Sequence, residues 1–177
     1  DVSLDTLLER IATVALEQVN ARYAALGVMD ESGKLTRFIH VGMTPDEVRI
    51  IPHPPEGRGL LGEVIKSDFP IRVSEISEHP SSVGFPAKHP LMHSFLGVPI
   101  KAGDKPLGQI YLTEKIGAPE FTQDDEGIIE MLGTYAAVAI QNARLYDDLR
   151  EHDRALTRRN EDLFLLNNIA EVLTASL

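Results

Sequence analysis

The chain has 177 residues and no cysteine. The absence of cysteine excludes disulfides, thiolate metal sites, cysteine nucleophiles and thioether-linked cofactors, and it is consistent with a reducing compartment. Positive charge is also scarce, because 17 lysines and arginines stand against 27 aspartates and glutamates, for a net charge of −10. Nucleic-acid binding needs clustered Lys and Arg to neutralise phosphates, so this composition argues against a nucleic-acid partner.

Long apolar runs are missing as well. No stretch approaches the roughly 18–20 apolar residues that span a bilayer, and no signal peptide opens the chain. We therefore expect no membrane partner and a cytoplasmic location. The start at Asp1 instead of a methionine indicates a piece of a longer protein. Apolar residues make up 43% of the chain, which suffices for one good core with an appendage or for two very small domains.

The first half of the chain alternates between helical and strand periodicity. Apolar residues at helical spacing predict an N-terminal helix, capped by Ser3 or Asp5. Two strands over 23–30 and 35–41 follow, joined by a tight turn. Alternation along the first strand assigns four residues to one face: Tyr23, Ala25, Gly27 and Met29. Beyond this hairpin the sequence predicts a short helix, a proline-rich loop, a second helix and a brief strand at 44–51, 52–59, 60–67 and 71–73.

A long irregular segment covers residues 74–92, with room for one turn of helix at 74–79. Its prolines remove backbone donors and favour extended neighbours, so regular structure is disfavoured. Loops of this length are unusual inside a compact domain and commonly bind something. Because the segment carries three large apolar side chains, we interpret it as a binding loop: Phe85, Leu91 and Met92.

A second hairpin follows this loop, with strands over 94–101 and 107–114. Alternation places one set of side chains on the core face: Leu96, Val98, Ile100, Ile110 and Leu112. The opposite set shares the other face: Phe95, Gly97, Gln109, Tyr111 and Thr113. A face with a glycine, a tyrosine hydroxyl and a phenylalanine, overhung by a histidine-bearing loop, is a suitable wall for a flat ligand.

The C-terminal third predicts one helix of about 50 residues that starts after its cap at Thr122. Apolar residues step along it by three and four, and Asn142, His152 and Arg159 fall on the same seam. Such a seam is typical of a parallel dimeric coiled coil, so we expect a homodimer through this helix, with a mobile amphipathic tail as the alternative. The segment 165–172 echoes 7–14, which is either a chance match between two amphipathic helices or the start of a second copy of the same module.

The order of elements (helix, hairpin, short helices and loop, hairpin, helix) predicts an α+β fold, with a central antiparallel sheet and both terminal helices on one face. Residues 3–148 resemble GAF sensory domains. We assign 1–148 to this domain and 149–177 to a helical coiled-coil linker toward a following domain. Glu114-Lys115, Phe121 and Asp125-Glu126 also resemble the Asn-Lys…Phe…Asp-Glu signature of cyclic-nucleotide-binding GAF domains, with Glu114 in place of Asn. A Lys115–Asp125 ion pair and a core Phe121 would serve as structure in any GAF domain.

A closer resemblance runs almost without gaps over residues 23–146, to the first GAF domain of haem-containing sensor histidine kinases of the DevS/DosT class. The segments that carry it are Gly84-Phe-Pro, His89-Pro-Leu-Met, Phe95-Leu-Gly-Val-Pro, Tyr111-Leu-Thr-Glu-Lys and Asp124-Asp-Glu. The resemblance implies a non-covalent haem b with His89 as the iron ligand and Tyr111 on the distal side. It also implies a regulatory, non-enzymatic domain of a two-component histidine kinase. Its partners would be a diatomic gas (O2, NO or CO) and a downstream kinase or second GAF domain in the same chain.

Ligand chemistry agrees with these assignments. A neutral imidazole is the usual ligand where iron binds a diatomic gas reversibly, and a tyrosine hydroxyl can donate to bound dioxygen. By parity and loop position we expect further walls from Gly27, Met29, Phe38, Leu91, Met92 and Phe95. Gly27 departs from some haem relatives, which carry a carboxylate there, and this predicts easier ligand access. Three other histidines are assigned to the surface or to loops: His40, His53 and His79. His93, four residues after His89, is the competing candidate for the iron, and the resemblance implies that this position is not the ligand.

The alternative is a haem-free GAF domain. Such a domain would act as a dimerisation scaffold, or would bind a small metabolite or a cyclic nucleotide.

Overall fold

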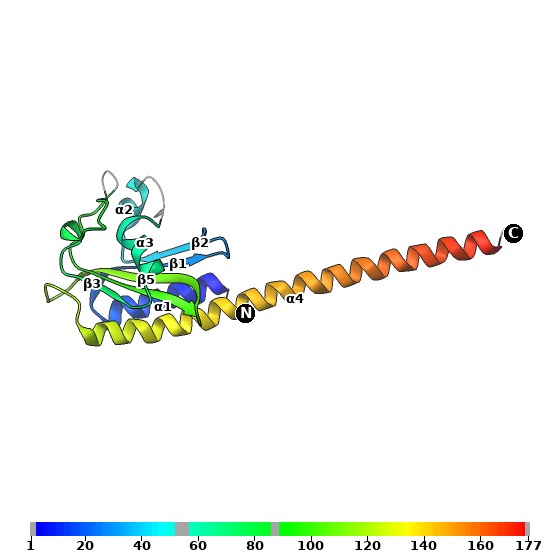
Figure 1. Cartoon of the computed structure of the whole chain (residues 1–177). Coiled ribbons are helices and arrows are strands. Elements are labelled where there is room, and N and C mark those ends of the chain that lie inside the picture. Colours follow the sequence, from blue (N-terminus) through cyan, green and yellow to red (C-terminus); the bar gives the residue numbers. More distant parts are fainter. Residues whose placement is uncertain (1–2, 52–56, 86–88, 176–177) are drawn as a thin grey trace. The chain divides into compact units, whose positions relative to one another are not determined.

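A computed structural model describes residues 3–51, 57–85 and 89–175. In chain order the elements are α1 (Leu4–Gln18), β1 (Ala21–Met29), β2 (Leu35–Val41), α2 (Pro45–Ile50), α3 (Gly59–Lys66), β3 (Ile71–Val73), the 3-10 helix η1 (Ile76–Glu78), β4 (Phe95–Ala102), β5 (Lys105–Lys115) and α4 (Gln123–Ala175). The strands form one antiparallel sheet in the order β2-β1-β5-β4-β3 (Figure 1). The predicted α+β fold is confirmed, with both hairpins in place. Most of the loop predicted at 52–59, including His53, lies outside the described residues.

The helix starts follow from side-chain caps. Ser3, and not Asp5, caps α1, because its Oγ accepts from the Thr6 backbone N–H at 3.3 Å. Thr44 begins α2 with a reciprocal capping box, in which the Glu47 carboxylate accepts from the Thr44 N–H. Thr122 caps α4 as predicted, with its Oγ1 3.2 Å from the Asp125 nitrogen.

The strand pairing shows why β1 begins earlier than predicted. Ala21, two residues before the expected start, pairs with Lys115 of β5. The Ile116 N–H also donates to the Asn20 carbonyl at 2.7 Å. A strand boundary set by a partner about 90 residues away in the chain leaves no signal in local periodicity.

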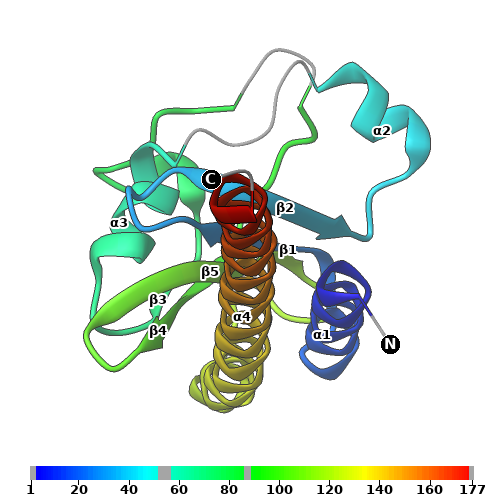
Figure 2. The same ribbon diagram turned by 90° about the vertical axis from the view of Figure 1, so that its right-hand side faces the viewer.

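The two faces of the sheet are covered by different elements, as Figure 2 shows. One face of the sheet packs against α1 and the first turns of α4. The core residues of β1, β4 and β5 on this face form the larger apolar cluster, which includes Leu26, Leu96, Ile110 and Leu112. The opposite face packs on α3 and the loop segments, and its smaller cluster includes Tyr23, Val64, Met92 and Phe95. Both predicted alternations are therefore confirmed, together with the placement of the terminal helices on one face.

The chain divides into two compact units, Asp1–Ile140 and Gln141–Leu177, and α4 runs from the first into the second. Its length of 53 residues confirms the prediction of one long helix. In the second unit, large apolar side chains lie exposed along the helix: Leu145, Leu149, Leu156, Leu163 and Leu166 among them. Within the described part of the chain, no helix has both the length and the apolar character needed to cross a membrane.

Candidate functional site

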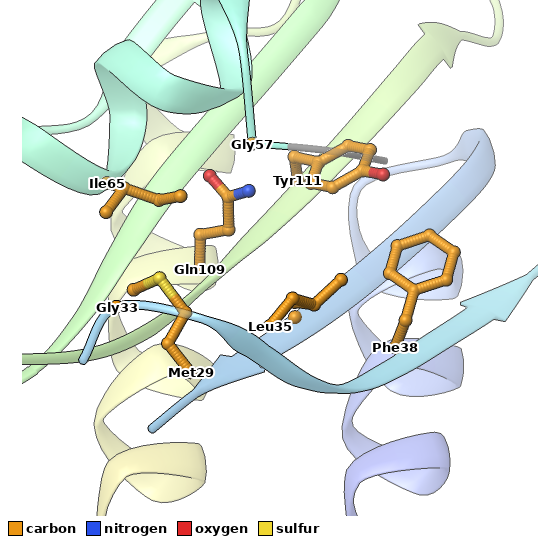
Figure 3. Close-up of a pocket in the computed structure, with 9 residues that line it drawn as sticks. Met29, Gly33, Leu35, Phe38, Gly57, Ile65, Gln109 and Tyr111 are labelled. Carbon is orange, nitrogen blue, oxygen red and sulfur yellow. The ribbon is translucent and has the colours of Figure 1, made fainter. Parts of the chain in front are cut away.

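A pocket lies on the sheet face that α1 and α4 do not cover (Figure 3). β1, β2 and β5 form its floor, and α3 and two glycines complete it: its lining consists of Gly27, Met29, Gly33, Leu35, Phe38, Gly57, Ile65, Gln109 and Tyr111. The cavity measures about 50 Å³. Pockets for drug-sized ligands and cofactors measure about 300–1,000 Å³. The cavity in this form therefore has room for water, and a larger ligand requires the segments above the sheet to move outward.

Strand register explains which side chains meet in the pocket. Gly27 on β1 pairs with Phe38 on β2 and with Gln109 on β5, so it lies between these two side chains. Tyr111, two residues after Gln109, shares the same face of β5. A Cβ at Gly27 would lie 2.9 Å from Leu35 Cδ1, so the missing side chain keeps this part of the pocket open. The predictions that Gly27, Met29 and Phe38 share a face with Tyr111 agree with this lining.

Tyr111 presents a phenol that stays protonated. Burial raises the pKa of Tyr111 above its ordinary value of 10.0, so the hydroxyl remains a donor throughout the physiological range. Its ring stacks on Phe95, with ring centres 6.0 Å apart. Phe95 itself is buried beneath the loop. Packing against Phe95 therefore fixes the position of the Tyr111 ring.

His89 has a defined tautomer. Its Nδ1 lies 2.8 Å from the Pro90 carbonyl oxygen. A carbonyl can only accept, so Nδ1 must carry the hydrogen and the neutral ring keeps its lone pair on Nε2. The ring also stacks on Phe85, with centres 5.0 Å apart and an interplanar angle of 18°. His89 does not line the 50 Å³ cavity, and residues 86–88 beside it lie outside the described residues.

Two other residues that were predicted as walls of the site, Met92 and Leu91, differ in burial. Met92 is buried, and its sulfur accepts from the Thr113 hydroxyl at 3.1 Å. The side chain of Leu91 is 77% exposed and does not line the cavity. In extended chain, neighbouring side chains point to opposite sides, so the inward Met92 turns Leu91 outward.

The end of the histidine-bearing loop is fastened to the end of β5. The His93 N–H donates to Glu114 Oε1, and the His93 ring nitrogen Nδ1 lies 3.2 Å from the same oxygen. Ser94 accepts from the Glu114 N–H at 3.1 Å through its carbonyl, and from the Lys115 N–H at 2.8 Å through its hydroxyl. Glu114 has a φ of 61°, a left-handed conformation that is uncommon for this residue type. These bonds place His93 at the strand end.

Lys115 then connects β5 to α4. Its ammonium donates to both oxygens of Asp125, at 3.0 and 2.8 Å, and to the Val19 carbonyl at 2.9 Å. Burial would raise the pKa of Asp125, but the hydrogen bond from Lys115 and the Thr122 N–H outweigh it and hold the pKa below 3.8. Phe121 is 1% exposed, in the core. The sequence expectation of a structural ion pair and a core phenylalanine is confirmed.

Two of the other histidines, His40 and His79, have local partners. His40 lies against the Phe38 ring, with ring centres 6.0 Å apart. His79 Nδ1 accepts from the Ser81 N–H at 3.2 Å. Sequence reasoning did not include Gln109 among the site residues, although it had placed Gln109 on the face of Tyr111. The available signal was an amide in a strand whose buried residues are otherwise apolar apart from Thr113.

Comparisons with known proteins agree on the fold. A Nif-specific regulatory protein from Herbaspirillum seropedicae is 24% identical, over 98% of this chain and 34% of its own length. This chain thus spans about a third of that relative. The GAF domain of a phosphoenolpyruvate-protein phosphotransferase from Coxiella burnetii superposes with a TM-score of 0.71 at 23% identity, covering 84% of this chain and 88% of that one.

A second solved structure is the second GAF domain of DevS from Mycobacterium smegmatis. It superposes with a TM-score of 0.59 at 20% identity and covers 83% of this chain and 99% of that one. The model of the family described as "GAF domain" matches residues 1–141. On this match and the shared fold, the chain belongs to the GAF domain family.

Proposed function

We propose that this GAF domain is the haem-binding, gas-sensing input of a cytoplasmic two-component histidine kinase. The proposal rests on the segment resemblance over residues 23–146 and on one observation, the fixed tautomer of His89. Similarity to a regulatory protein also favours a regulatory role over a catalytic one. When bound, haem b would supply an iron that binds a diatomic gas.

The donor set suits this group. A coordinating histidine typically donates its other ring N–H to a carbonyl or carboxylate, and the Pro90 carbonyl fills that role for His89. The Phe85 ring restricts the rotation of the imidazole. On the other side, Tyr111 offers a protonated hydroxyl among apolar walls, where it can donate to a polar ligand.

Space is what the present form lacks. The cavity of about 50 Å³ beside Tyr111 is smaller than a macrocycle needs, so binding requires an outward shift of the loop with His89. Such a shift would strain the bonds that tie His93 and Ser94 to the end of β5.

Those bonds supply a route for the signal. Lys115 is bonded through its backbone to Ser94 and through its ammonium to Asp125, in the first turn of α4. Arg72 on β3 adds a second link, because it donates to the Glu126 carboxylate at 3.0 Å and to the Phe121 carbonyl at 2.9 Å. A ligand can shift this arrangement only by binding its two states with different affinity.

The output end of α4 supports a homodimer. Its exposed leucines follow a seven-residue repeat that also includes Asn142, a residue type that selects parallel dimers when it lies in the seam. We expect Leu149→Asp and Leu156→Asp to convert the dimer to a monomer in analytical ultracentrifugation. A wild type that sediments as a monomer at all concentrations would contradict the dimer.

Expression with a haem supply tests the haem assignment. We expect a coloured protein with a Soret band, which His89→Ala abolishes because the iron ligand is lost. His93→Ala is the matched control, four residues away and bonded to Glu114, and should keep the band. A colourless wild type, or an intact band in His89→Ala, would exclude the proposal.

The second candidate is a haem-free GAF domain that dimerises or binds a small metabolite, and the lack of space for a macrocycle beside Tyr111 favours it. A cyclic nucleotide fits less well, because Lys115, Phe121 and Asp125 of the resembling signature are engaged in structural contacts. A colourless protein whose melting temperature rises with a metabolite would support this candidate.

A further inference from the structure

The part of α4 that belongs to the first unit has two apolar faces. One packs on the sheet, and its buried residues include Ile129 and Ile140. The other is a stripe formed by Met131, Tyr135 and Val138, whose side chains are 56%, 63% and 51% exposed. A helix that packs on a single sheet needs only one apolar face. Packing on the sheet therefore does not explain the exposed stripe.

The exposed stripe belongs to the same seven-residue repeat as the leucines of the second unit. Steps of seven residues form two rows that run in sequence from the first unit into the second: Tyr135, Asn142 and Leu149 in one row, and Met131, Val138 and Leu145 in the other. In heptad notation the first row occupies the a positions and the second row the d positions, which places Asn142 at an a position. The repeat that predicts the dimer therefore begins inside the first unit.

A second copy of the chain matches this stripe. In a parallel coiled coil, the a and d residues of one helix pack against the same positions of the other, so one repeat supplies both halves of the contact. The positions that flank the stripe carry no charge and would not repel their equivalents in a second copy: Leu132, Thr134, Ala139 and Gln141. A partner of another sequence would not require the stripe to continue the leucine repeat.

We propose that the first units of two chains pair directly along α4, with Met131, Tyr135 and Val138 packed against the same residues of a second copy. This inference rests on the homodimer of the proposed function and extends its interface from residues 141–177 to the sensory domain itself. Each α4 would then lie between its own sheet and the α4 of the second copy. Because Lys115 of β5 is bonded to Asp125 in the first turn of α4, a shift at one ligand site would act on both copies.

Cysteine cross-linking tests this contact directly, because the chain has no cysteine of its own and each variant carries only one. Met131→Cys in the full chain should form a covalent dimer on mild oxidation with copper-phenanthroline, since d-position side chains meet across a parallel pair. Glu130→Cys is the matched control: it is exposed on the next residue of α4 but lies off the stripe, and it should remain a single chain on a non-reducing gel. Leu145→Cys lies in the same row in the second unit and reports on the dimer of the proposed function.

The outcomes separate this inference from the proposed function. A cross-link in Leu145→Cys without one in Met131→Cys would overturn the inference and retain the homodimer. The absence of a cross-link in both variants would overturn the inference and the homodimer together. Equal cross-linking of Glu130→Cys and Met131→Cys would also overturn the inference, because it would show random collision and not a defined contact.

Sedimentation equilibrium supplies a second readout that needs no cysteine. Tyr135→Asp should raise the dissociation constant of the dimer by about 30-fold or more, because an aromatic side chain is lost from the interface in both copies. Phe69→Asp removes another exposed aromatic side chain, outside the stripe, and should leave the constant unchanged. A dissociation constant of Tyr135→Asp equal to that of the wild type would overturn the inference.

Discussion

The two faces of the central sheet have the same strands but different contents. Toward α1 and the start of α4, the face is apolar, and Leu26, Leu112 and Ile110 have no exposed surface. The other face has two tyrosines, a cavity, and a glutamine whose oxygen has no hydrogen-bond partner among the described residues. Close packing favours stability, and unpaired polar groups with space beside them favour binding. One face of the sheet therefore contributes mainly to stability, and the other face has the features of a binding site.

The largest expected effect comes from the packed face. Leu26→Ala should lower the free energy of unfolding by about 4 kcal/mol, because it leaves a cavity in a fully buried cluster. Leu35→Ala, on the partly exposed pocket wall, should cost only about 1 kcal/mol. Urea denaturation of both variants measures the difference. Equal losses would contradict the contrast between the faces.

The next largest loss of stability is expected at the Lys115–Asp125 ion pair, which joins β5 to α4. Lys115→Met leaves the Asp125 carboxylate buried without its cation, which should cost about 3 kcal/mol. The exposed pair Arg49–Asp46 supplies the control, because Arg49→Met should cost less than about 0.5 kcal/mol. A loss in Lys115→Met no larger than in the control would show that the joint does not depend on this ion pair.

Acid should weaken the same joint. The folded-state pKa of Asp125 lies below 3.8, so its contribution to stability is present above pH 3.8 and is lost as the pH falls through the folded pKa. Asp125→Asn should remove this part of the acid dependence. Thermal melts of both proteins between pH 6 and pH 2 test it, and parallel curves would contradict the assignment.

Much of this contrast could be predicted from the sequence. Alternation in β1, β4 and β5 predicted the face of each side chain, and the residues at the starts of α1 and α4 predicted the caps, because both signals are local. The side of Leu91 and the start of β1 at Ala21 could not be obtained this way. The first lies in an aperiodic loop, and the second depends on pairing with Lys115 across the sheet. Gln109 was placed on the correct face, but its unpaired oxygen is visible only in three dimensions.

The smallest effect on stability is expected inside the pocket. Gly27→Ala brings a methyl group to 2.9 Å from the flexible end of Leu35, which can move aside, so the cost should stay below about 1 kcal/mol. The added group narrows the pocket, so gas association in the haem-loaded protein should slow. The matched control is Ala25→Ser, which lies on the same face of β1 and keeps the backbone unchanged. Gly33→Ala is unsuitable as a control, because Gly33 has a φ of 81° and an alanine there would strain the backbone. An association rate equal to that of the wild type would show that Gly27 does not control access.

The most direct test is a crystal structure of the haemin-loaded protein, with the iron located by its anomalous scattering. The account predicts iron on the face of the sheet that carries Gln109 and Tyr111, with His89 Nε2 as its protein ligand. Iron bound elsewhere on the molecule, or held by a different histidine, would contradict it.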